Sequence, residues 1–174
     1  MAKRKILTDN DPTLRMICRP VEKITPRIIT LLDDMLETMR EADGVGLAGP
    51  QVGVLRRVVV VETEPGNPIE LINPVIVDQS GEQEGGEGCL SLPGRSGCVR
   101  RPMHVTVKAL NREGKEFTVE GSELTARAFC HEIDHLDGIL YTDKALYMND
   151  PEDETEEQPE ERRSVRRHKF SGKH

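Results

Sequence analysis

The sequence predicts an α+β domain in which mostly antiparallel sheets pack around a central helix that carries an H-E-x-x-H motif. One amphipathic helical pattern lies early in the chain and another lies late, and the candidate strands lie together between them. This order does not alternate strand and helix, so it favours antiparallel sheets over a parallel βαβ arrangement. With 174 residues, the chain is long enough for one domain with a sizeable core.

The first predicted helix lies in TPRIITLLDDMLETMREADG, residues 25–44. Thr25 is a candidate N-cap, Pro26 suits the first helical position, and Gly44 marks the end of the helix. The apolar residues recur at helical spacing, which predicts one buried face. These residues are Ile28, Leu32, Met35, Leu36 and Met39.

Four later segments have the composition of β-strands. They are residues 56–62, 69–78, 104–110 and 115–120. The last two are joined by the turn from Asn111 to Gly114, which is typical of a hairpin.

The second predicted helix lies in GSELTARAFCHEIDHLDG, with Ser122 as a candidate N-cap and Gly138 as a candidate stop. His131 and His135 are one helical turn apart, so both imidazoles can reach one metal ion. In the extended form of this motif a third histidine follows, but that position is Tyr141 here. The third ligand is therefore expected elsewhere in the chain.

The best candidate for the third ligand is Cys89, in the Gly-rich segment GGEGCLSLPG (85–94). A thiolate binds borderline divalent metals strongly, and two imidazoles plus one thiolate leave a fourth position for water. A lone cysteine is also compatible with a buried apolar position. Glu152 and Glu154 are weaker candidates, because they lie in a polar segment without a core face.

Other side chains of the second helix have expected positions relative to its histidines. Leu124 and Ala128 share the histidine face and would form a short apolar wall, while Arg127 near that face is expected to form a structural ion pair. Cys130 is expected to point away from the metal, since adjacent helical residues differ by about 100°.

A third segment, DGVGLAGPQVGV (43–54), allows an extended, exposed backbone against which a ligand could lie. Within it, Gln51 could supply an amide donor. A surface turn is the alternative interpretation of this segment. A dinucleotide-binding loop is disfavoured, because the glycines follow a helix and no βαβ unit surrounds them.

Composition excludes several classes of function. The formal net charge of −7 argues against a general nucleic-acid binder. No apolar run approaches the ~20 residues that span a bilayer, and the basic N-terminus lacks the apolar segment of a secretion signal. We therefore expect a cytoplasmic protein with neither a membrane nor a sequence-specific nucleic-acid partner. Its four cysteines are expected to be reduced.

Taken together, GVGLAGPQ, EGCLS and HEIDHLDG resemble the three signatures of the peptide deformylase family, in order and in spacing. The resemblance spans most of residues 1–145. It implies a metal-dependent hydrolase that removes the N-formyl group from the initiator Met of nascent proteins and releases formate. It also implies one divalent metal ion per chain, typically Fe(II), for which Zn, Ni or Co can substitute.

The resemblance assigns roles to individual residues. It gives Cys89, His131 and His135 to the metal and makes Glu132 the catalytic acid–base. It gives Gln51 and the Leu90 backbone N–H to the oxyanion.

The resemblance further implies that N-formyl-Met peptides bind as a strand along the backbone of Val45, Gly46 and Gly88. Leu124 and Ala128, with Val45, are candidate walls of the Met pocket. The chain departs from the family pattern at two positions. Cys130 stands where the family usually has Gln, and Gly49 where it usually has Ala.

Two other functions remain open from the motifs alone. A zinc endopeptidase shares the helix motif, but it needs a third His or Glu downstream and gives EGCLS no role. A non-enzymatic structural metal module needs a closed fourth ligand, for which Cys98 is the available thiol, and it leaves Glu132 and Gln51 unexplained.

The charged C-terminal segment is expected to lie outside the catalytic domain, which we assign to residues 1–148. Residues 149–161 are acidic and 162–169 are basic, so residues 149–174 are expected to form a solvated, partly disordered tail. Some members of the family dock on the ribosome through a basic C-terminal helix. The resemblance therefore also offers the ribosome as a partner of this tail.

Overall fold

The computed structural model describes residues 2–149, and the C-terminal segment considered above lies outside this range except for Asn149. The helices are α1 (Pro26–Glu41) and α2 (Leu124–Leu136), with short 3₁₀ turns η1 (Pro12–Arg15), η2 (Gly49–Val52) and η3 (Tyr141–Asp143). The strands are β1 (Gly46–Ala48), β2 (Val58–Val61), β3 (Ile69–Ser80), β4 (Gln83–Cys89), β5 (Leu92–Arg101), β6 (His104–Leu110), β7 (Glu116–Ser122) and β8 (Ala145–Met148). No helix in residues 2–149 is long and apolar enough to cross a membrane.

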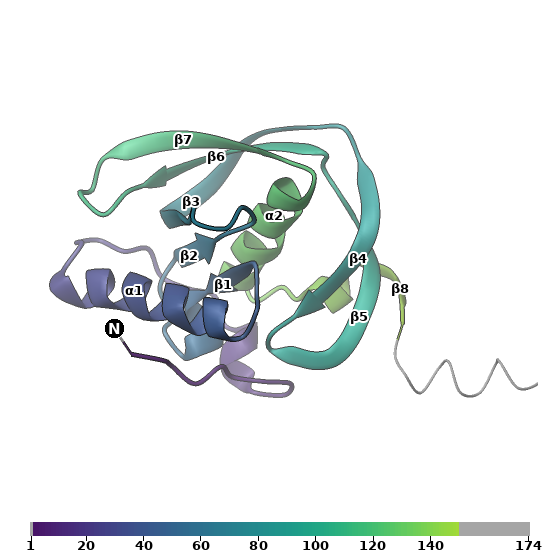
Figure 1. Cartoon of the computed structure of the whole chain (residues 1–174), viewed down its shortest axis with the longest axis horizontal. Coiled ribbons are helices and arrows are strands. Elements are labelled where there is room, and N and C mark those ends of the chain that lie inside the picture. The colour runs from purple at the N-terminus through teal and green to yellow at the C-terminus, as the bar shows by residue number, and fades with distance from the viewer. Residues whose placement is uncertain (1, 150–174) are drawn as a thin grey trace, which may run out of the picture.

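The strands form two antiparallel sheets. One has the order β1-β2-β3-β6-β7 and the other the order β4-β5-β8. Helix α2 lies at the centre with the larger sheet and the long β4–β5 ribbon around it, and α1 lies on the far side of β1 and β2 (Figure 1). The predicted α+β fold with a central motif-bearing helix is confirmed.

Strand β2 shows why this arrangement suits the sequence. Its four valines are all buried, although neighbouring side chains point to opposite faces of a sheet. Val58 and Val60 pack in the cluster that contains the apolar face of α1, whereas Val59 and Val61 pack in the cluster around α2. The strand is continuously apolar because helices cover both of its faces.

The helix ends agree with the predicted stops at Gly44 and Gly138. Gly44 N–H donates to the Met39 carbonyl at 3.0 Å, which closes α1, although the left-handed residue is Asp43, with φ 56°. At the end of α2 Gly138 itself is left-handed, with φ 71°.

The prediction of Ser122 as the N-cap of α2 was wrong. Ser122 is the last residue of β7, where its hydroxyl lies 2.8 Å from Nδ1 of His104. Glu123 is the N-cap and has φ 55°. The chain turns from strand into helix over this single residue, and Ser122 stays in the β-ladder opposite His104.

The four predicted strands correspond to β2, β3, β6 and β7, with β6 placed at its predicted bounds. Strands β4, β5, β8 and the short β1 were not predicted. The segment 43–54 was expected to be extended and exposed, and β1 within it is extended. The three residues of β1 are buried, however, because β1 packs between α1 and α2.

Candidate metal centre and active-site pocket

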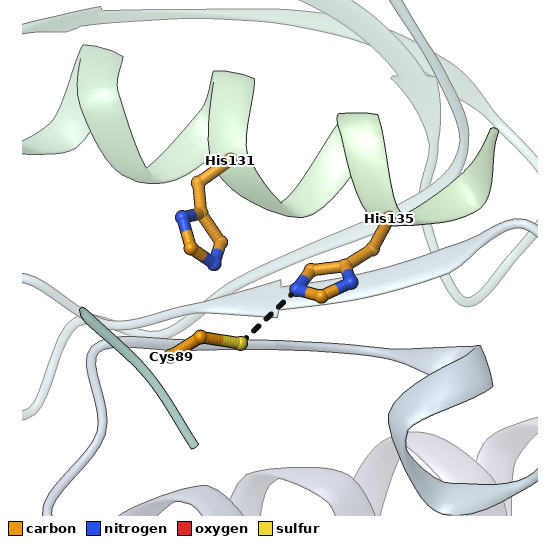
Figure 2. Close-up of side chains that lie close together, drawn as sticks. All are labelled: Cys89, His131 and His135. Carbon is orange, nitrogen blue, oxygen red and sulfur yellow. Dashed lines mark hydrogen bonds between the residues drawn. The ribbon is translucent and has the colours of Figure 1, made fainter. Parts of the chain in front are cut away.

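Three side chains from two parts of the fold converge beside α2. His131 and His135 project from neighbouring turns of α2, and Cys89 approaches from the end of β4 (Figure 2). Cys89 Sγ lies 3.4 Å from Nε2 of His135. One ligand atom from each of the three residues lies within 4.8 Å of the other two, so a single ion can draw all three together.

A buried carboxylate fixes the orientation of His131. Glu87 Oε1 lies 2.8 Å from Nδ1 of His131, and because a carboxylate only accepts, Nδ1 is the donor. This leaves Nε2 for a metal, which is how metal-binding histidines are usually held. Two arginines hold Glu87 in turn. Arg101 donates from Nε and Nη2 at 2.9 and 3.0 Å, and Arg127 from Nη1 at 2.6 Å.

The charges at the site favour a cation between the ligands. Burial lowers the pKa of His131, but hydrogen bonds to Cys89 and Glu87 outweigh it and raise the pKa to about 10. Burial lowers the pKa of His135 to about 3, so this imidazole is neutral and keeps a free lone pair. A soft anionic donor, a neutral imidazole and an imidazole that attracts positive charge form a donor set that fits a divalent metal.

Tyr141 is the residue at the position of the missing third histidine. It begins η3 and is only 1% exposed. Its ring stacks on His131, with the ring centroids 5.8 Å apart and the planes inclined by 21°. At this position the chain therefore packs an aromatic ring against one ligand instead of supplying another.

A cavity of about 400 Å³ opens beside the three ligands. Every predicted site residue lines it except His135, which is only 1% exposed. The lining includes Val45, Gly46, Gln51, Gly88, Cys89, Leu90, Leu124, Ala128, His131 and Glu132. Val45 and Leu124 are 42% and 50% exposed, so they present apolar surface at the mouth of the cavity.

The side-chain amide of Gln51 is held in one orientation. Its Oε1 accepts from the Ala48 backbone N–H at 2.9 Å. Its Nε2 consequently points into the site, 3.1 Å from Ser91 Oγ and 3.5 Å from Cys89 Sγ. Because the Ala48 N–H fixes which end of the amide is the oxygen, the nitrogen end is assigned as well.

Glu132 lies beside the candidate ligands, and one of its carboxylate oxygens is left without a hydrogen bond to the described residues. Its Oε1 is 4.0 Å from Nε2 of His131, and its Oε2 is buried without a hydrogen bond among the described residues. Burial raises the pKa of Glu132 to about 7. The carboxyl packs against the backbone of Gly46, where an added Cβ would lie 2.8 Å from Glu132 Cγ and Oε1.

The two departures from the family pattern both lie at buried positions. Cys130 is 6% exposed and belongs to the apolar cluster of α2, and burial raises the pKa of its thiol. A Cβ at Gly49 would lie 2.7 Å from the carbonyl oxygens of Val54 and Arg56, so the backbone leaves no room for a side chain there.

Sequence reasoning missed the residues that support the ligands. Glu87 was part of the motif EGCLS but received no role, and Arg101 was not considered. Arg127 was predicted to form a structural ion pair, and it does so with Glu87. One signal was available. Glu87 and Cys89 are two residues apart, so in a strand they project to the same side, and a metal-binding imidazole needs a partner for its second nitrogen.

Fold and site together define a class of hydrolase in which an H-E-x-x-H helix is completed by a thiolate from a neighbouring strand. The sequence profile of the polypeptide deformylase family matches residues 3–153. A peptide deformylase of Acetivibrio thermocellus is 60% identical over 163 residues, which cover 94% of this chain and 95% of that protein. One from Alkaliphilus metalliredigens is 61% identical over 146 residues, covering 84% of this chain and 99% of that protein.

Solved structures agree with the sequence comparison. The crystal structure of a peptide deformylase from Legionella pneumophila matches with a TM-score of 0.80 and 47% identity, covering 82% of this chain and 86% of that one. The Thermotoga maritima peptide deformylase matches with a TM-score of 0.81 and 35% identity, covering 84% and 100%. The chain belongs to the polypeptide deformylase family and is a metal-binding hydrolase of this kind.

This membership decides between the functions that the motifs left open. An endopeptidase would require a third ligand downstream of the helix, whereas within residues 2–149 it is Cys89 that meets both histidines. A closed structural site would require Cys98, which does not belong to the ligand group and pairs through its strand with β8.

Proposed function

We propose that this chain removes the N-formyl group from the initiator Met of nascent proteins, with Cys89, His131 and His135 holding one divalent metal ion. The thiolate and imidazole donors fit a borderline divalent metal, and the resemblance to the family favours Fe(II), with Zn, Ni or Co able to substitute. When bound, the ion supplies Lewis-acid chemistry, since it polarises the formyl carbonyl and lowers the pKa of water. The other steps are carried by the side chains and backbone of the chain itself.

The substrate would bind as an extra strand. The cavity is bordered by β1 and β4, and each is the edge strand of its sheet. A free strand edge can pair with an extended peptide through its backbone groups. Val45, Gly46 and Gly88 are the residues proposed to make these hydrogen bonds. The Met side chain would pack against Leu124 and Ala128.

The oxyanion that forms when water adds to the formyl carbon would be stabilised by Gln51 and the Leu90 N–H. The amide orientation of Gln51 supports this role, because its Oε1 is already bound to Ala48 and its Nε2 faces the cavity. Such a preorganised donor needs no reorganisation during the reaction, and losing one typically lowers turnover by ~10²–10³-fold.

Glu132 would move the proton. It takes a proton from water as the water oxygen bonds to the formyl carbon, and it returns this proton to the nitrogen as the C–N bond breaks. Formate and a free amino group are the products. One observation carries the proposal. Glu132 lies beside the ligands, its Oε2 has no hydrogen bond within residues 2–149, and burial raises its pKa to about 7, which suits an acid–base at neutral pH.

Two substitutions separate proton transfer from metal binding. Glu132→Gln should retain the metal but lower formate release from a formyl-Met peptide by at least ~10²–10⁴-fold. Cys89→Ser should lose metal, because a hydroxyl is a poor substitute for a thiolate. Cys130→Ser is the matched control, since it makes the same chemical change in a buried cysteine outside the ligand group, and it should keep its metal.

Metal content and formate release on all three variants test the division of roles. Loss of metal in Glu132→Gln, or wild-type turnover in that variant, would contradict it. Unformylated peptides should not be cleaved. The Fe(II) assignment is tested by metal analysis after purification without oxygen, and by decay of the iron form in air. Full activity after prolonged aeration argues against iron.

The remaining proposals concern context. We assign residues 1–148 to the catalytic domain and 149–174 to a charged tail, and the end of the family match at residue 153 supports this division. The substrate supports a cytoplasmic location. Docking of the basic residues 162–169 on the ribosome is proposed from their charge and from the resemblance to family members that dock through a basic C-terminal helix. Deleting residues 150–174 should weaken co-sedimentation with ribosomes at low salt without changing turnover of short peptides.

A further inference from the structure

A second large hollow lies away from the metal centre, where α1 begins. Its volume is about 1140 Å³, and it is lined by the segment that precedes α1, by the first turns of α1 and by residues 53–56. We call it the basic groove. Among the described residues that line it, five are cations and only Glu22 is an acid; the cations are Arg4, Arg19, Lys23, Arg27 and Arg56. The chain as a whole is acidic, so the groove is a local reversal of charge.

Three arginines of the basic groove differ from most other arginines in residues 2–149, whereas the fourth, Arg4, pairs with Asp34. Eight arginines there lie within 4.0 Å of a carboxylate. They are Arg4, Arg15, Arg40, Arg57, Arg100, Arg101, Arg112 and Arg127. Arg19, Arg27 and Arg56 have no such carboxylate among the described residues, and all three are exposed in the groove.

These unpaired positive charges lie at backbone positions where a positive charge lowers the stability of the fold. Arg19 and Arg56 occupy facing positions of an isolated backbone bridge, in which Arg19 N–H donates to the Leu55 carbonyl at 3.1 Å. Like charges in facing positions destabilise the pairing of two strands. Arg27 lies in the first turn of α1, which contains no acidic residue although the helix dipole favours one there. Cations retained at two unfavourable places indicate an anion supplied from outside the chain.

We propose that the basic groove binds the phosphate backbone of an RNA duplex without reading its base sequence. Guanidinium groups pair well with phosphates. None of the residues that line the groove is aromatic, whereas proteins that hold single strands stack bases on aromatic rings. The nascent proteins on which this family acts emerge from an RNA-rich particle, so contact with RNA helices would keep the enzyme near its substrates. The acidic remainder of the chain restricts this contact to one face.

The salt dependence of binding measures the number of phosphate contacts directly. Each contact contributes about 0.9 to the slope of log K against log salt concentration for a B-form DNA duplex, a value we adopt for RNA. The probe is a labelled RNA duplex of about 20 base pairs and arbitrary sequence, titrated with the full chain between about 50 and 200 mM salt. In the double variant Arg19→Gln and Arg56→Gln, the slope should fall by about 1.8 in magnitude, so that the wild type loses about 12-fold more affinity over this range.

The matched control removes two other exposed positive charges. Arg40 and Arg100 already pair with Glu62 and Glu84. Arg40→Gln combined with Arg100→Gln should therefore leave the slope unchanged although the net charge changes equally. An equal fall in slope for both double variants would overturn the proposal, since net charge alone would then account for binding. An unchanged slope in the groove variant would also overturn it.

Two further measurements test for a membrane contact and for an intact active site. With vesicles rich in anionic phospholipid, loss of vesicle binding in the groove variant together with an unchanged RNA slope would overturn the proposal. Formate release from a short formyl-Met peptide should be the same in wild type and groove variant, so a failure of the RNA proposal is distinguishable from a failure of the deformylase mechanism. If the Arg19/Arg56 variant does not fold, Lys23→Gln with Arg27→Gln provides the same test.

Discussion

Replacing Glu87 by glutamine should damage both the stability of the protein and its affinity for metal. Each carboxylate oxygen of Glu87 accepts two hydrogen bonds. Oε1 accepts from His131 Nδ1 and Arg101 Nη2, and Oε2 accepts from Arg101 Nε and Arg127 Nη1. An amide has one acceptor and one donor end, so in either orientation its NH₂ group faces two donors.

The magnitude follows from the burial of this network. Arg101 and Arg127 have side chains only 2% and 8% exposed, and the Glu87 side chain is 4% exposed. Removing one partner of a buried ion pair costs about 3–5 kcal/mol, because the remaining charge is left unpaired. For a domain of this size, 1 kcal/mol lowers the melting temperature by about 2–4 °C, so we expect a decrease of about 10 °C. Loss of the acceptor for His131 should weaken metal binding by about 10–100-fold.

Glu84→Gln is the matched control for this experiment. Glu84 lies on the same strand and also pairs with an arginine, but both side chains are about half exposed. Exposed pairs contribute at most about 1 kcal/mol. Thermal unfolding of the metal-stripped proteins and competition with a chelator measure the two effects. If Glu87→Gln unfolds and binds metal as Glu84→Gln does, the buried network does not have the role argued for it.

Two further predictions follow from close contacts elsewhere. In Gly46→Ala the new Cβ would lie 2.8 Å from Glu132 Cγ, so Glu132 should shift and formate release should fall by about 10²-fold while metal content is retained. Gly86→Ala, which meets nothing within 4 Å, is its control, and equal activities would contradict the reasoning. Asp34 accepts from the Ala2 N–H and from Arg4, which lower its pKa from 3.8. Because its folded pKa is lowered, Asp34 stabilises the fold above pH 3.8 and loses this effect as pH falls through the folded value. Asp34→Asn should therefore lower the free energy of unfolding at neutral pH by about 1–2 kcal/mol, and progressively less as the pH falls below 3.8. A difference in urea unfolding that is independent of pH would contradict this.

Local signals in the sequence were sufficient where a short segment determines its own structure. The spacing of His131 and His135 needs only helical geometry, and the turn from Asn111 to Gly114 specifies the β6–β7 hairpin. Strand β4 was missed for a physical reason. Its sequence QEGGEGC lacks the apolar alternation of a strand, because its side chains face the site or solvent instead of an apolar core.

The partners of Glu87 were not predicted, because their meeting is not determined by any short segment of the sequence. Arg101 comes from β5 and Arg127 from α2, and no spacing along the chain relates them to β4. Their meeting depends on how the smaller sheet docks against the central helix. Arg101 also binds Asp134 of α2 at 2.7 Å, so the residues that orient the metal ligands are also the polar contacts between sheet and helix.

The replacement of a third histidine by Tyr141 links the metal site to this docking. A site with all its ligands close together in sequence could form on one helix and its following turn. Here two of the candidate ligands come from α2 and the third from β4, 46 residues before His135. The thiolate reaches the histidines only when β4 is seated against α2, and Glu87 on the same strand then orients His131. Metal affinity and docking of the smaller sheet are therefore coupled in this fold, since each requires the same strand in the same place.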